Sequence, residues 1–150
     1  MVSPVHTWIV LASGKGARIL LNDGVGHGIK PVEGAVLTHD PKRDSDVYSD
    51  RQGRVHDRVG TARHAAERPT SGAEQDRRAF AGEIAAYLDK YGHKGSFNRL
   101  IIIAEPSLLG LIRAALSPSV ADRVVAEIAK DLTRAETPAL LAALSSHIAV

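Results

Sequence analysis

The apolar run Leu100-Ile-Ile-Ile-Ala104 constrains the fold of this chain more than any other feature of its sequence. A strand built from it has no polar face, so it has to be covered on both sides. Strands of this kind occupy the centre of sheets that carry helices on both faces. The run therefore predicts an α/β fold with a central strand at residues 100–104.

The first forty residues predict an N-terminal β-meander. Residues 7–12 form a β-branched and aromatic run of strand length, and residues 17–21 form a second apolar run. The Gly-rich segment 13–16 between them is typical of a hairpin turn. A third strand is expected within residues 29–38, where Val32, Val36 and Leu37 are the apolar positions.

The second half of the chain predicts helices that alternate with strands. Ser71-Gly-Ala-Glu74 has the spacing of a capping box, and an apolar face at helical spacing follows to about residue 91. Pro106 suits the first turn of a short helix that includes Leu116, residues 119–122 resemble a helical turn, and residues 123–129 are a candidate strand. Thr137, as a cap before Pro138, predicts a last helix to about residue 146. We expect one domain, residues 1–150, with a mixed β-sheet and packed helices.

Composition excludes several chemistries and points to no particular ligand. The chain has no cysteine, which rules out disulfides, thiolate nucleophiles and cysteine-based zinc sites. Its formal net charge is only +2, so any basic surface has to be local. The first residues lack the features of a signal peptide, and no run approaches the roughly 20 apolar residues of a membrane span. A cytoplasmic location without membrane association is therefore expected.

Two glycine-containing segments resemble nucleotide-binding loops only superficially. Gly14-Lys15-Gly16 lacks the spacing of a phosphate-binding loop, and a strand rather than a helix follows it. A hairpin turn is the better interpretation. Gly24-Val-Gly-His-Gly28 lacks the strand-to-helix context of a dinucleotide site and is interpreted as a flexible turn.

The polar segment between residues 39 and 71 offers no recognisable catalytic or metal-binding motif. Its aspartates at 44, 46 and 50 lack the glycine and glutamate of a calcium loop. Its histidines, His39, His56 and His64, do not have the spacing of zinc ligands. A serine nucleophile elbow is also missing. We therefore predict no metal, no cofactor and no catalytic residue, and interpret the segment as a long polar loop at about residues 39–71.

Arginines are the most distinctive residues of this loop and of the helix after it. Between residues 51 and 78 they outnumber the four acidic residues, and arginine is suited to bidentate phosphate contacts. Few aromatic residues lie among them, so stacking on single-stranded bases is not the expected mode. The candidate RNA-binding residues are Arg51, Arg54, Arg58, Arg63, Arg68, Arg77 and Arg78.

Three segments together resemble one known family. Asp50-Arg-Gln-Gly-Arg54, Phe97-Asn-Arg-Leu-Ile-Ile-Ile-Ala-Glu-Pro106 and Arg123-Val-Val-Ala-Glu-Ile-Ala-Lys-Asp-Leu-Thr133 resemble the bacterial host-attachment proteins. That family is similar to the middle domain of eukaryotic and archaeal class-one release factors. The resemblance implies an RNase H-like, release-factor middle-domain-like layout. It also implies a role in attachment to host cells, or an association with ribosomes or RNA.

The residues themselves argue against two activities of related folds. Release factors carry a Gly-Gly-Gln tip on the loop that corresponds to residues 39–71, whereas this sequence has no Gly-Gly pair. RNase H-type nucleases hold metals on clustered carboxylates, one of them on the first strand, and residues 7–12 contain no acid.

These observations lead to one main hypothesis and two alternatives. The main hypothesis is a non-enzymatic ribosome- or RNA-associated protein, in which Arg51, Arg54, Arg58 and Arg63 provide the main phosphate contacts and Arg68, Arg77 and Arg78 flank them. The first alternative is a cytoplasmic protein-interaction factor that influences host attachment through a protein partner. The second is an uncharacterised hydrolase in which the polar loop covers the site.

Overall fold

A mixed five-stranded sheet forms the centre of the domain. The computed structural model describes residues 5–39 and 72–150, and within them the strand order is β3-β2-β1-β4-β5. β1 (Thr7–Ser13) pairs antiparallel with β2 (Gly16–Asn22), which pairs antiparallel with β3 (Lys30–Thr38). β1 also pairs parallel with β4 (Arg99–Ala104), and β4 pairs parallel with β5 (Val124–Ala129). The predicted α/β fold and N-terminal meander are confirmed, and the order is compatible with an RNase H-like layout.

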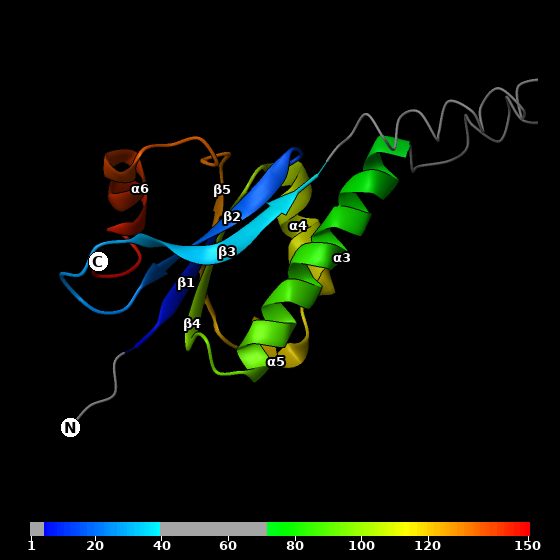
Figure 1. Cartoon of the computed structure of the whole chain (residues 1–150). Helices are drawn as coiled ribbons and strands as arrows, with labels where there is room; N and C mark the ends of the chain where they lie inside the picture. Colours follow the sequence, from blue (N-terminus) through cyan, green and yellow to red (C-terminus); the bar gives the residue numbers. More distant parts are fainter. Residues whose placement is uncertain (1–4, 40–71) are drawn as a thin grey trace, which may run out of the picture.

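Helices cover both faces of this sheet (Figure 1). α3 (Gly72–His93), α4 (Pro106–Ala115) and the short α5 (Pro118–Ala121) lie on one face, while α6 (Thr137–Leu144) lies on the other. The apolar residues of β4 alternate between two cores, since Ile102 packs with α3 and α4 and Ile103 packs with α6. The prediction that residues 100–104 form a central strand covered on both sides is therefore confirmed.

Several predicted element ends are corrected by one or two residues. Thr137 is not the cap of the last helix, because Glu136 occupies the N-cap position, Thr137 is helical and the helix ends at Leu144. The helix that begins at Pro106 ends at Ala115, and Leu116 is already in an extended conformation. α3 runs from Gly72 to His93, two residues beyond the expected end at about residue 91. The proposed capping serine, Ser71, lies outside the described residues.

The β1–β2 connection is the predicted hairpin turn. β1 pairs with β2 up to Ser13 and Gly16, so only Gly14 and Lys15 form the turn. A Cβ atom added at Gly16 would lie 2.7 Å from the carbonyl oxygen of Leu37 in β3. Only glycine allows β2 and β3 to approach this closely without displacement of the backbone.

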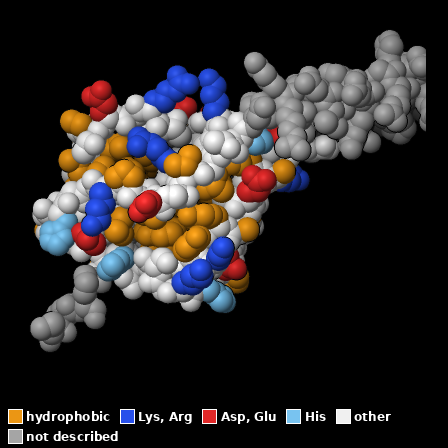
Figure 2. Space-filling model, in the orientation of Figure 1, with side chains coloured by type: hydrophobic (Ala, Val, Ile, Leu, Met, Phe, Trp, Pro, Cys, Tyr) orange, Lys and Arg blue, Asp and Glu red, His pale blue; other side chains and the backbone are white. Residues whose placement is uncertain are grey.

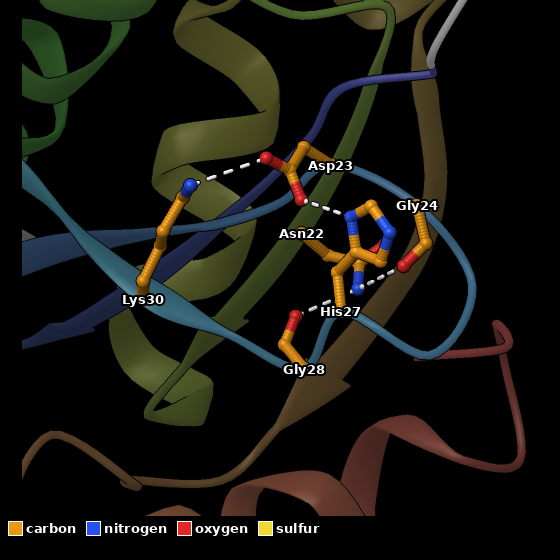
Figure 3. Close-up of polar contacts among 6 residues, drawn as sticks. All are labelled: Asn22, Asp23, Gly24, His27, Gly28 and Lys30. Carbon is orange, nitrogen blue, oxygen red and sulfur yellow. Dashed lines mark hydrogen bonds and ion pairs between the residues drawn. The ribbon is translucent and has the colours of Figure 1, made fainter.

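The β2–β3 connection is organised by one buried asparagine (Figure 3). The Nδ2 group of Asn22 donates to the carbonyl oxygens of Gly24 (3.1 Å) and Gly28 (2.7 Å). Gly28 has a φ of +67°, in the region that favours glycine. At the surface, Asp23 pairs with His27 at 2.8 Å, and this hydrogen bond is the largest cause of the lowered pKa of Asp23. The segment connects two strands, as predicted, and has no dinucleotide-binding context.

Candidate functional site

A cleft of about 740 Å³ opens where the parallel strands end. The β1–β2 turn lines it, together with Glu105 directly after β4 and the connection after β5. Residues at the start of α3 and at the end of β3 complete the lining. In open α/β sheets, ligands bind in the crevice outside the carboxyl ends of the parallel strands. The cleft lies in this position, so it is the candidate functional site.

Basic side chains are prominent among the described residues of the cleft: Lys15, Arg18, Arg77 and Arg134. Figure 2 shows Lys and Arg side chains gathered along the upper edge of the molecule, where β1, β4 and β5 end. Arg18 has a structural role, because its guanidinium donates to the carbonyl oxygens of Thr133 (2.9 Å) and Ala135 (3.0 Å). It thereby holds the β5–α6 connection against β2.

The other three basic side chains of the cleft do not hold neighbouring segments of the described chain in place through hydrogen bonds. Within residues 5–39 and 72–150, the charged groups of Lys15, Arg77 and Arg134 donate no hydrogen bond. The Nε atom of Arg77 is fully buried and has no partner among the described residues. A buried polar atom without a partner is rare in native proteins and calls for an explanation, such as a bound water, ion or ligand.

Two of the three acidic side chains that line the cleft are engaged by neighbours. Asp76 pairs with Nε2 of His39, whose ring stacks on Phe80 at a centroid distance of 4.6 Å. Oδ1 of Asp131 accepts hydrogen bonds from the hydroxyl group (2.6 Å) and the backbone N–H (3.1 Å) of Thr133. The hydroxyl bond is the main cause of a lowered pKa of Asp131, and the charges of Arg134 and Lys15 add to it.

Glu105 is the third acid, and its carboxylate accepts no hydrogen bond from the described residues. It stands at the N-cap of α4, but its side chain makes no capping hydrogen bond. Its Oε1 atom lies 3.4 Å from the position of a Cβ atom added at Gly14, so the carboxylate lies beside the β1–β2 turn. Among residues 5–39 and 72–150, no three His, Asp or Glu side chains are grouped so that they could hold a metal ion.

The structure separates the two predicted arginines that it describes. Arg77 lines the cleft. Arg78 lies outside it, with 61% of its side chain exposed and a 3.5 Å ion pair to Glu74. The other predicted RNA-binding arginines, at positions 51, 54, 58, 63 and 68, lie outside the described residues. They therefore remain predictions.

Sequence reasoning missed Lys15, Glu105 and Arg134 as site residues. Gly14-Lys15-Gly16 was a visible signal, and its interpretation as a turn was correct. What the turn alone does not reveal is that β1 and β4 run parallel, which brings Lys15 to the same sheet edge as Glu105.

Comparisons with known proteins place the whole fold in one family. A family described as a protein required for attachment to host cells matches residues 8–144, from β1 to the end of α6. An uncharacterized protein of Rickettsia prowazekii (strain Madrid E) is 29% identical over 119 residues, which cover 78% of this chain and 79% of the relative. In the described part of the chain, no helix has the length and apolar character needed to cross a bilayer. The match includes all five described strands, and the chain belongs to the family of proteins required for attachment to host cells.

Proposed function

We propose that this protein contributes to attachment to host cells as a non-enzymatic binding protein, acting in the cytoplasm through a protein partner. The observation that carries the proposal is the family match over residues 8–144, which spans every described strand and helix from β1 to α6. Because the match covers the described sheet and the helices on both of its faces, it supports an attachment role for this domain as a unit.

The chemistry of the cleft supports binding rather than catalysis. Asp76 and Asp131 already accept hydrogen bonds from His39 and Thr133. The His39–Asp76 pair resembles part of a hydrolytic triad, but His39 is not among the residues that line the cleft. A general base has to lie within hydrogen-bond reach of the proton that it removes. This arrangement therefore favours the binding hypothesis over the hydrolase alternative.

A deletion strain of the organism that encodes this chain tests the attachment proposal. We expect the strain to adhere to host cells less than its parent while it grows at the same rate in medium, and the wild-type chain to restore adherence. Protease treatment of intact cells tests the location, because a cytoplasmic chain should survive until the cells are lysed. Undiminished adherence of the deletion strain would contradict the proposal.

RNA association remains a second candidate function, favoured by the uncommitted guanidinium of Arg77 and the exposed Arg78 at the start of α3. It is supported further by the resemblance to release-factor middle domains. We expect co-sedimentation with ribosomes that weakens as salt rises. Replacement of Arg54 and Arg58 by alanine should reduce the salt slope by about one unit for each phosphate that the protein no longer neutralises. Absence from every ribosomal fraction at low salt would exclude this candidate.

A further inference from the structure

We propose that the cleft binds a small phosphate monoester whose phosphate contacts Lys15, Arg77 and Arg134 and whose hydroxyl group donates to Glu105. This proposal goes beyond the attachment role, for which the family match is the main support. The ligand class follows from three features of the cleft: its size, its basic side chains whose charged groups have no hydrogen-bond partner among the described residues, and the Glu105 carboxylate, which also has none.

The size and position of the cleft suit a small molecule. Its volume of about 740 Å³ falls within the range of about 300–1,000 Å³ that is usual for small-ligand pockets. Apolar groups from Ala17, Val36 and Leu37 line it beside the charged side chains. A largely apolar wall with a few convergent polar groups is the usual composition of such a site.

The basic groups that lack hydrogen-bond partners favour a phosphate as the ligand. Lys15, Arg77 and Arg134 come from three separate segments and line one cleft, and their charged groups donate no hydrogen bond to any described residue. A phosphate ester supplies several acceptor oxygens and up to two negative charges, which matches more than one cation. The Nε atom of Arg77 is buried without a hydrogen-bond partner, so no hydrogen bond within the described residues fixes this guanidinium in place.

Glu105 indicates that the phosphate carries a hydroxylated group. An ionised carboxylate only accepts hydrogen bonds, so it repels phosphate and favours a hydroxyl donor. Glu105 does not cap α4, although it occupies the N-cap position, and its carboxylate lies beside Gly14 in the cleft. The site should therefore prefer a phosphate ester with hydroxyl groups to inorganic phosphate.

Isothermal titration calorimetry on the full chain tests the proposal with four probes: adenosine monophosphate, ribose 5-phosphate, inorganic phosphate and adenosine. We expect both esters to bind more tightly than inorganic phosphate, and adenosine to bind more weakly than adenosine monophosphate. A clear preference for adenosine monophosphate would identify a nucleotide site. Equal affinity for the two esters would identify a sugar-phosphate site.

A matched pair of arginine variants locates the binding. Arg77→Gln should weaken ester binding at least about tenfold, the scale of one missing hydrogen bond to a charged group. Arg78→Gln removes the same charge one residue further along α3, outside the cleft, and should leave the affinity within about twofold. If Arg77→Gln does not fold, Lys15→Gln on the hairpin turn replaces it.

Glu105→Gln tests the specificity separately. Loss of the carboxylate charge should strengthen the binding of inorganic phosphate and reduce the preference for the esters. The proposal is overturned if none of the phosphates binds at millimolar concentration, or if the two arginine variants weaken binding equally. Binding of an RNA oligonucleotide without binding of any small phosphate would also overturn it.

Discussion

At the scale of single residues, Arg123 joins three segments of the fold. Its Nη1 group donates to the carbonyl oxygens of Gly92 in α3 (2.9 Å) and Phe97 before β4 (3.1 Å). Its guanidinium also lies over the Phe97 ring, 5.4 Å from the ring centroid. Charge-assisted bonds to the last carbonyls of a helix satisfy groups that have no partner within the helix.

We predict that Arg123→Ala lowers the free energy of unfolding by about 2 kcal/mol, because two carbonyl groups lose a charged donor. Urea denaturation followed by circular dichroism measures the change. Arg113→Ala is the control, since Arg113 pairs with Glu127 at the surface and 59% of its side chain is exposed. Such exposed pairs contribute roughly 0–1 kcal/mol. Equal losses in the two variants would contradict the structural role of Arg123.

Asp131 provides a pH-dependent prediction at the same scale. The Thr133 hydroxyl is the main cause that lowers its pKa from the ordinary value of 3.8. A carboxyl group with a lowered pKa in the folded state adds stability above its ordinary pKa, and this contribution is lost as the pH falls through the lowered value. Thr133→Val removes the hydroxyl, so we expect the pKa of Asp131 to rise towards 3.8 in a carboxyl-carbon NMR titration. An unchanged titration would contradict this cause.

At the scale of secondary-structure elements, glycines in different settings should respond to alanine with opposite signs. In β2, a Cβ atom at Gly16 would meet a β3 carbonyl oxygen at 2.7 Å, whereas at Gly82 in α3 it would meet nothing within 4 Å. We predict that Gly16→Ala destabilises the protein by about 1–3 kcal/mol through overpacking. Gly82→Ala should stabilise it by about 0.5–1 kcal/mol, because alanine favours a helix interior. Thermal unfolding of both variants measures the signs.

The predicted elements matched best where one local pattern decides the structure. Residues 100–104 and 8–12 are apolar throughout and too short for a typical buried helix, so a buried strand is favoured, and both strands were predicted to within one residue. Element ends were harder to predict, because they depend on tertiary contacts. Thr137 appeared to be a cap before Pro138, yet the chain already has the N-cap backbone conformation at Glu136, without any side-chain capping bond.

At the scale of the whole molecule, the cleft could not be predicted, because strand order creates it. Its residues lie in five separate segments, within residues 13–18, 36–38 and 72–77, at position 105, and within residues 131–134. They meet because β1, β4 and β5 run parallel and end at the same edge of the sheet. Arg77 and Arg78 are adjacent and carry the same charge, so the sequence does not distinguish them, yet only Arg77 lines the cleft.

The two cores share one sheet, which predicts that the described domain unfolds as one cooperative unit. Trp8 is the single tryptophan of the chain, and it packs against Phe97 and Tyr91 in the core beneath α3. Leu144, the last residue of α6, is fully buried in the other core. The adjacent strand residues Trp8 and Ile9 face opposite cores, so destabilisation of one face should be transmitted through the sheet to the other.

We therefore predict that Leu144→Ala lowers the free energy of unfolding by about 2–5 kcal/mol and shifts two probes equally. The probes are the fluorescence of Trp8, which reports on the opposite core, and far-ultraviolet circular dichroism, which reports on the whole chain. Their urea midpoints should coincide in both the wild type and the variant, as two-state unfolding requires. Leu144→Ile, which keeps the side-chain volume, is the control and should shift both midpoints less. A Trp8 midpoint that stays at its wild-type value while the circular dichroism transition splits would show that the two faces unfold separately.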